Sequence, residues 1–315
     1  MTQISSLQSG LKQTGEQGLA EHERPFAHPF VKWAGGKSQL VVKMQKHFPE
    51  TFQRYYEPFL GGASVFFYLV HLRPHPFPAT LSDTNRDLMN AYKVIQSNVE
   101  GLIKDLTKRQ RAFWKQPNKS ARAEHYLQVR GNPPNIDSEN VERAGWFIFL
   151  NKTCYNGLYR VNSKGVFNVP YGDASPKTRL FDKQNLLTIH QLLNQEGIEL
   201  VCDDYAKVLQ KTKANDFAYL DPPYYSANNK GFTAYTTSIF SKDEQKALAE
   251  VVKTLAEKGV KVLVSNADAE YIRGLYEEKK PMGKTYSYHS VEALRVINCR
   301  GANRTGAKEI LIKNF

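Results

Sequence analysis

Short apolar runs alternate along the sequence with longer helix-like segments. Such alternation is typical of a parallel sheet that helices cover on both faces. One helix also has a clear start signal, because Ser241 can cap it and Glu244, three residues on, completes a capping box. We therefore predict an α/β fold with strands at 55–57, 79–82, 199–202, 217–220, 260–265 and 309–312 and helices at 64–72, 85–95 and 242–257.

Residues 97–185 interrupt this alternation. They are basic and show helical rather than strand patterning, and the stretch is long for an ordinary set of crossover helices. We interpret 97–185 as an inserted, mainly helical subdomain, with 26–96 and 186–315 as the two parts of the sheet domain. Residues 1–25, rich in Gln, Ser, Gly and Glu, are predicted to be a flexible tail.

The charge of the chain favours a polyanionic partner. Lys and Arg number 43 against 31 Asp and Glu, a formal charge of +12, and cationic surfaces bind phosphate backbones by releasing counterions. Cys154, Cys202 and Cys299 lie far apart without C-x-x-C spacing, which is typical of reduced thiols in the cytoplasm. Since no apolar stretch has the length of a membrane span and the N-terminus is not signal-like, we predict a cytoplasmic protein without membrane contact.

The segment YYEPFLGGASVFFYL, residues 55–69, predicts a strand, a Gly-Gly turn and an apolar helix. Gly61 and Gly62 allow a ligand to approach the backbone where the first strand ends. Asp83 ends the next strand, where nucleotide-binding α/β folds hold ribose hydroxyls. Because the full G-x-G-x-x-G is missing, an adenosine ligand without a pyrophosphate fits better than a dinucleotide. An ordinary tight turn followed by a helix-starting Asp is the alternative.

The segment FVKWAGGKSQL, residues 30–40, contains G-K-S, as phosphate-binding loops do. Val31 stands where such a loop requires its first glycine, so that pattern fails. We interpret the segment as a basic, aromatic and glycine-rich cover for a small ligand. His71 and His75 have the spacing of helical metal ligands, but Pro74 lies between them, and no metal site is predicted.

The stretch DFAYLDPPYY, residues 216–225, predicts a strand that ends at an acid. Proline cannot donate to a strand ladder, so Pro222 and its neighbour should end the strand directly after Asp221. Asp221 and the Pro222 carbonyl can accept hydrogen bonds from an exocyclic amino group, while Tyr224 can stack on the base. These contacts would make the nitrogen nucleophilic toward a methyl sulfonium, with catalysis by positioning and electrostatics.

The segment NKTCYNGLYRVNSKGVFNVPYG, residues 151–172, lies in the basic insert and mixes aromatic, Asn and Arg side chains. Arg can pair with guanine, Asn with adenine, and aromatic rings can stack on displaced bases; the segment offers Arg160 and several Asn, among them Asn156. The alternative is that the aromatic side chains pack the core of the insert itself.

Together these motifs resemble the Dam-type DNA adenine-N6 methyltransferases, in the order typical of that family. The resemblance rests on FVKWAGGK, EPFLGGASVF, SDTN, NGLYRVNSKGVFNVPYG, DPPYY with FTAYTTSIFS, and VLVSNAD, and it spans roughly residues 28–315. It implies a Rossmann-like class I methyltransferase sheet with an inserted, mainly helical DNA target-recognition domain. It also implies S-adenosylmethionine as cofactor and a flipped adenine in duplex DNA as substrate.

The resemblance also assigns roles to residues. Asp221, Pro222 and Tyr224 would hold the flipped adenine, and Tyr155 would fill the space that it leaves. Lys32, Leu158 and Arg160 occupy positions that read flanking bases in GATC-specific members, and Asn156 completes the DNA-binding set. Cofactor contacts are expected from Trp33, Lys37, Phe59, Gly61, Asp83 and Asp221.

Two other functions are compatible with parts of this pattern. A cytosine-N4 methyltransferase uses the same physics, although its members more often carry Ser in place of Asp221. A DNA-binding protein without activity would not need the pairing of Asp83 with Asp221. The expected partner is double-stranded DNA and the expected location is the cytoplasm, in association with the nucleoid. A partner restriction endonuclease and the oligomeric state stay open.

Overall fold

The computed structural model describes residues 26–73, 75–135, 140–174, 179–226, 240–281, 283, 285–293 and 307–315. Within them the chain is a mixed α/β protein built on a seven-stranded sheet of order β3-β2-β1-β4-β5-β7-β6. The pairs β1–β2, β1–β4, β2–β3 and β4–β5 are parallel, whereas β7 runs antiparallel to both β5 and β6. The strands are β1 (Tyr55–Glu57), β2 (Ala79–Ser82), β3 (Ile198–Val201), β4 (Phe217–Leu220), β5 (Lys261–Ala267), β6 (Ser287–Ala293) and β7 (Ala307–Lys313).

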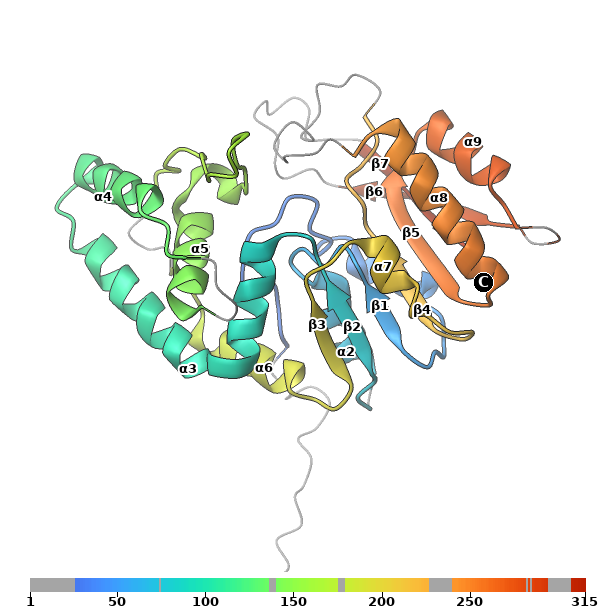
Figure 1. The fold of residues 1–315 in the computed structure, drawn as a ribbon, viewed down its shortest axis with the longest axis horizontal. Helices are drawn as coiled ribbons and strands as arrows, with labels where there is room; N and C mark the ends of the chain where they lie inside the picture. Colours follow the sequence, from blue (N-terminus) through green and yellow to red (C-terminus); the bar gives the residue numbers. More distant parts are fainter. Residues whose placement is uncertain are drawn as a thin grey trace, which may run out of the picture.

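Helices cover both faces of the sheet and extend beyond one edge of it (Figure 1). They are α1 (Val41–Met44), η1 (Gln45–His47), α2 (Ser64–Leu72), α3 (Arg86–Trp114), α4 (Lys119–Gly131), α5 (Val141–Thr153), η2 (Tyr155–Gly157), α6 (Lys183–Leu193), α7 (Tyr205–Leu209), α8 (Lys242–Glu257) and α9 (Glu270–Glu278).

The central strands β1 and β4 are buried on both faces because their successive side chains enter different cores. Tyr55 and Phe217 belong to the larger core, which includes residues of α2, α3, α5 and α6. Their neighbours Tyr56 and Ala218 belong to the second core, under α8 and α9. Continuous apolar runs such as 217–220 follow from this two-sided burial.

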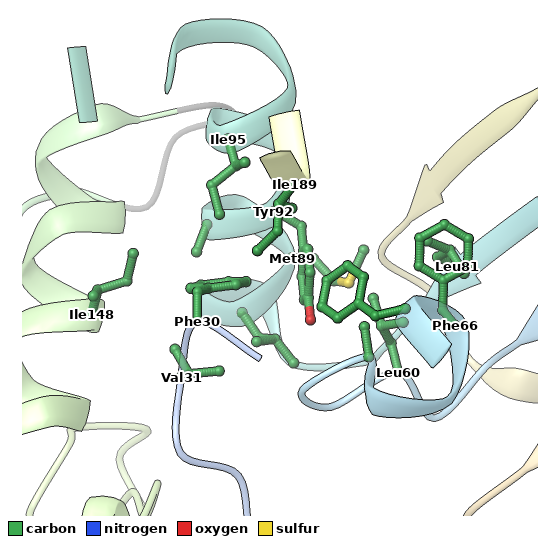
Figure 2. Close-up of a cluster of buried hydrophobic side chains, with 14 of the residues drawn as sticks. Phe30, Val31, Leu60, Phe66, Leu81, Met89, Tyr92, Ile95, Ile148 and Ile189 are labelled. Atoms are coloured by element: carbon green, nitrogen blue, oxygen red, sulfur yellow. The ribbon is translucent and has the colours of Figure 1, made fainter. Parts of the chain in front are cut away.

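The helices α3, α4 and α5 form a lobe beside the sheet, on the left in Figure 1. The lobe has no separate core, since Phe113 and Trp146 are buried in the same cluster as the larger face of the sheet. The N-terminal segment joins the two parts, and Phe30 lies edge-on to Tyr92 of α3 with ring centroids 4.9 Å apart. Figure 2 shows Phe30 and Val31 between α3 and Ile148 of α5.

The six strands predicted from the sequence are present, and the capping box at Ser241 and Glu244 forms as expected. The helix predicted over 85–95 is longer than expected, since α3 continues to Trp114 through a non-helical residue at Asn98. Strand β6 was not predicted. Its sequence SYHSVEA is mostly polar because it lies at the edge of the sheet, where one side of the strand is unpaired. The prediction of a parallel sheet is wrong in one respect, since β7 runs antiparallel to both of its neighbours, β5 and β6.

Candidate active site

The candidate site lies at the edge where β1, β2 and β4 end. These strands are parallel, so their carboxyl ends meet along one edge of the sheet. Gly61 lies in the turn after β1, Asp83 directly follows β2, and Asp221 directly follows β4. As predicted, β4 ends at Leu220, just before Asp221 and the proline pair.

The turn after β1 is tied to the end of β2. The Gly61 amide donates to Oδ2 of Asp83 at 3.1 Å, and the Asn85 amide donates to Oδ1 at 2.9 Å. Burial raises the pKa of the Asp83 carboxyl, and these backbone amides oppose the shift. Gly61 has φ of +48°, and a Cβ atom there would lie 2.6 Å from the Trp33 ring. Only glycine fits this turn without moving Trp33.

Asp221 forms an ion pair with Lys37 inside the protein. Lys37 Nζ lies 2.7 Å from Oδ2 of Asp221 and donates to the Gly35 carbonyl at 2.8 Å, and its side chain is only 3% exposed. The same Nζ lies 4.8 Å from the centre of the Tyr224 ring. Burial raises the pKa of Asp221 to about 6, although Lys37 acts in the opposite direction. The second oxygen, Oδ1, is buried and has no hydrogen-bond partner among the described residues.

Three side chains that the sequence analysis did not single out hold the residues after Asp221. The Tyr224 hydroxyl donates to Glu309 at 2.7 Å. The Pro223 carbonyl accepts from Gln245 of α8 at 3.0 Å, and the Gln245 side chain accepts in turn from Asn266 of β5. The Tyr225 amide donates to Asn266 at 3.2 Å. Gln245 and Asn266 are fully buried. A Gln on the apolar face of helix 242–257 is the one sequence signal for this contact.

A further buried carboxyl, Glu57, lies on β1. It accepts a hydrogen bond from Tyr55 at 2.8 Å and is 2% exposed. Burial raises the pKa of Glu57 to about 8, and the charge of Asp221 adds to the shift. The protonated form of Glu57 is therefore favoured at neutral pH.

Phe59 lies in an aromatic cluster with two residues that the sequence analysis missed. Its ring stacks on Tyr205 at 5.2 Å, and Phe240 packs edge-on against it at 6.1 Å. Tyr205 begins α7 shortly after β3 ends, at the same edge of the sheet. The cluster offers a flat apolar surface next to the strand ends.

The N-terminal segment and the NGLYR turn lie side by side. Asn151 of α5 accepts from the Lys32 amide at 2.8 Å and donates to the carbonyls of Lys32 and Gly157 at 2.8 and 3.0 Å. A Cβ atom on Gly157, at φ +67°, would lie 2.5 Å from the Lys32 side chain. Trp33 stacks on Tyr159 with ring centroids 6.0 Å apart. Lys32 and the turn thus form one surface.

The predicted DNA-binding residues differ in exposure. Tyr155 is 43% exposed and Asn156 is also exposed, with φ of +55°, whereas Leu158 is 9% exposed. Arg160 donates to Oδ1 of Asn168 at 2.6 Å and to its carbonyl at 3.1 Å. Some aromatic residues of the segment do pack the protein core, among them Phe167, which is 5% exposed.

A separate cavity of the described residues lies away from this site. That cavity, of about 780 Å³, lies between η1 and β6 and is lined by His47, His289 and Lys43 among others. Residues 232–239 of the predicted segment FTAYTTSIFS lie outside the described residues, and so does Cys299. Within the described ranges we find neither a helix long and apolar enough to cross a membrane nor a group of three potential metal ligands.

Comparison with known proteins identifies the family. Residues 33–297 match the D12 class N6 adenine-specific DNA methyltransferases. The chain is 40% identical to the Type II methyltransferase M.MjaIII of Methanocaldococcus jannaschii over 91% of this chain and 99% of that protein. It is 36% identical to the Type II methyltransferase M1.LlaDCHI of Lactococcus lactis, over 94% and 99%. It is 33% identical to the DNA adenine methylase of Vibrio cholerae, over 90% and 94%. The chain therefore belongs to the D12 class of N6 adenine-specific DNA methyltransferases.

Proposed function

We propose that the protein transfers a methyl group from S-adenosylmethionine to N6 of an adenine flipped out of duplex DNA. The observation that carries this proposal is the buried Oδ1 of Asp221, which has no partner among the described residues. A buried acceptor without a partner costs free energy that a bound donor would recover. The exocyclic amino group of adenine is a donor of this kind.

The residues near the strand ends suit S-adenosylmethionine, which supplies an electrophilic methyl group when bound. The Asp83 carboxylate, just after β2, can accept hydrogen bonds from ribose hydroxyls. Gly61, which has a positive φ, has no side chain that would block the approach of a ligand to this turn. Phe59 and Tyr205 provide an apolar surface for an adenine ring. Trp33 and Lys37 would enclose the ligand from the N-terminal segment, and Asp221 would face it from β4.

The catalytic roles follow from hydrogen-bonding capacity. Asp221 Oδ1 accepts one N–H bond of the adenine amino group, the Pro222 carbonyl accepts the other, and the Tyr224 ring stacks on the base. Both contacts draw the N6 lone pair out of conjugation and direct it toward the methyl group. The methylated nitrogen must then lose a proton, and Asp221, whose pKa is about 6, can accept it at neutral pH.

We assign the DNA-recognition domain to residues 97–185 and the catalytic domain to 26–96 and 186–315. A base inside a duplex cannot reach Asp221, so the adenine must be flipped out. Exposed Tyr155 suits the role of filling the space left in the stack. Lys32, Asn156, Leu158 and Arg160 would read or contact neighbouring bases, and the two hydrogen bonds to Asn168 orient the Arg160 guanidinium.

We propose GATC as the recognition sequence, on the basis of the NGLYR stretch and of Lys32 beside it. A protein that acts on chromosomal DNA would work in the nucleoid, with or without a restriction endonuclease of the same specificity.

The test is to incubate the protein with methyl-labelled S-adenosylmethionine and unmethylated DNA, then sequence the product for modified bases. Label on adenine N6 within GATC is the expected result. Label on adenine in another sequence would contradict the proposed GATC specificity but not the proposed reaction. Label on cytosine, or no label at all, would contradict the proposed chemistry.

A further inference from the structure

The last strand of the sheet contributes a carboxylate to the site. Because β7 runs antiparallel, its first residues lie at the edge where β5 ends, and Glu309 pairs with Ala267 of β5. The Tyr224 hydroxyl donates to Oε2 of Glu309 at 2.7 Å, across 85 positions of sequence. A parallel last strand would have put its carboxyl end here instead.

The Tyr224 hydroxyl has two possible acceptors. It lies close enough to Asp221 to be one of the groups that lower the pKa of that carboxyl. Burial and the charges of Asp221 and Glu309 raise the pKa of Tyr224, so the phenol keeps its single proton. A phenol has one proton to donate. In the structure it goes to Glu309, and Oδ1 of Asp221 is without a partner in the described part of the chain.

We propose that Glu309 is a positioning residue that holds the Tyr224 hydroxyl away from Asp221 and so keeps Oδ1 available to the adenine amino group. This inference rests on the proposed function. Without Glu309, the phenol would donate to Oδ1, the strongest remaining acceptor, and would compete with the substrate for it. The same contact fixes the direction of the Tyr224 ring, on which the base is to stack.

Glu309 also acts on Asp221 through its charge. The groups that face Asp221 are Lys37 from the N-terminal segment, Tyr55 and Glu57 of β1, Tyr219 of β4, Tyr224 and Glu309. Of these, the Glu309 carboxylate raises the pKa of Asp221, whereas Lys37 lowers it. Loss of the Glu309 charge should therefore let Asp221 ionise at lower pH.

The first test compares Glu309→Leu with the double variant Glu309→Leu/Tyr224→Phe. We expect Glu309→Leu to lower kcat for methylation of adenine in DNA roughly tenfold, as for the loss of one positioned hydrogen bond. Because phenylalanine has no hydroxyl to compete for Oδ1, the double variant should recover several-fold over the single variant. A double variant no more active than Glu309→Leu would overturn the proposal, as would a Glu309→Leu enzyme with the kcat of the wild type.

The second test uses Glu309→Gln, which preserves an acceptor for Tyr224 and removes the charge. We expect the acidic limb of kcat/KM against pH to move to lower pH, with S-adenosylmethionine affinity unchanged in calorimetry. The matched control is Glu250→Gln, which removes a carboxylate paired with Lys279 on the surface of α8; its limb should stay in place. A limb of Glu309→Gln that coincides with the wild type contradicts the inference. A wild-type enzyme that does not methylate adenine contradicts the proposed function instead.

Discussion

Lys37 Nζ lies 2.7 Å from Oδ2 of Asp221, although 184 positions separate the two residues in the chain. The contact joins the glycine-rich N-terminal segment to the end of β4. Both side chains are largely buried, with exposed fractions of 3% and 17%, so their interaction is little screened by solvent. The charge of Lys37 is thus one of the factors that set the ionisation of Asp221.

Replacing Lys37 should move the pH profile in the direction opposite to replacing Glu309. Lys37 lowers the pKa of Asp221, so Lys37→Met should raise it above its present value of about 6. We expect kcat/KM of Lys37→Met to fall more at pH 6 than at pH 8 relative to the wild type. Lys279→Met, which breaks a surface pair with Glu250, is the control. An acidic limb that stays in place would show that Lys37 does not act on Asp221.

Glu57 should make the protein less stable as pH rises. Its pKa in the folded protein is about 8, above the ordinary 4.5, so the folded state binds the extra proton and stability is lost as pH rises through this window. The side chain introduced by Glu57→Gln is neutral at every pH. The free energy of unfolding of this variant should therefore rise relative to that of the wild type by roughly 1 kcal/mol for each pH unit from 6 to 8. Asp221 acts in the same direction, but mainly below pH 6.

Urea unfolding of wild type and Glu57→Gln at several pH values measures this difference. Glu199→Gln, whose side chain is half exposed on the neighbouring part of the sheet, is the control and should run parallel to the wild type. Parallel curves for wild type and Glu57→Gln would mean that Glu57 ionises normally.

Replacing Asp221 and replacing Asp83, the two acids at the strand ends, should impair different steps. Asp221→Ala removes the proposed acceptor for the amino group and should abolish methyl transfer in a folded protein. Asp83→Ala should weaken S-adenosylmethionine binding by about 1.5 to 3 kcal/mol, the range for hydrogen bonds to a charged group. Calorimetry and single-turnover assays separate the two effects. Asp203→Ala, at a partly exposed acid after β3, should change neither. Near-normal turnover of Asp221→Ala would disprove the mechanism.

Arg160 should govern the choice of one base. A bidentate contact to guanine contributes about 1 to 3 kcal/mol of discrimination, so Arg160→Ala should relax one position of the site and leave cofactor affinity alone. Asn168→Ala should have a weaker effect of the same kind, because it frees the guanidinium that Asn168 orients. Lys164→Ala, in the exposed tip of the same segment, should keep the wild-type preference. Sequencing of methylated DNA pools gives the preference at each position.

Local sequence signals were enough to predict where several helices and strands begin or end. The proline pair marks the end of β4, and the Ser241 capping box marks the start of α8. Burial on both faces makes 217–220 recognisable as a strand. Strand β6 lacks this signal because an edge strand has no need of a continuous apolar run.

The partners of the site residues could not be predicted in the same way. The hydrogen bonds of Tyr224 to Glu309 and of Gln245 to the Pro223 carbonyl form because β7 and α8 pack beside the end of β4. Such contacts depend on register between strands and on which face of a helix is buried, and no local pattern encodes them. A buried Gln in an otherwise apolar helix face is a clue to a partner, but it does not say which one.

Asn151 bonds to both polar backbone atoms of Lys32 and to the carbonyl of Gly157. The residue after Lys32 is Trp33, whose ring packs against Gly61 at the end of β1. One short peptide is thus shared between the proposed nucleotide site and the turn that we propose to contact DNA. A ligand that moves this peptide changes the free energy with which the other ligand binds. Since such coupling is reciprocal, whatever factor the methyl donor adds to the affinity for the correct DNA sequence, that sequence must add to the affinity for the donor.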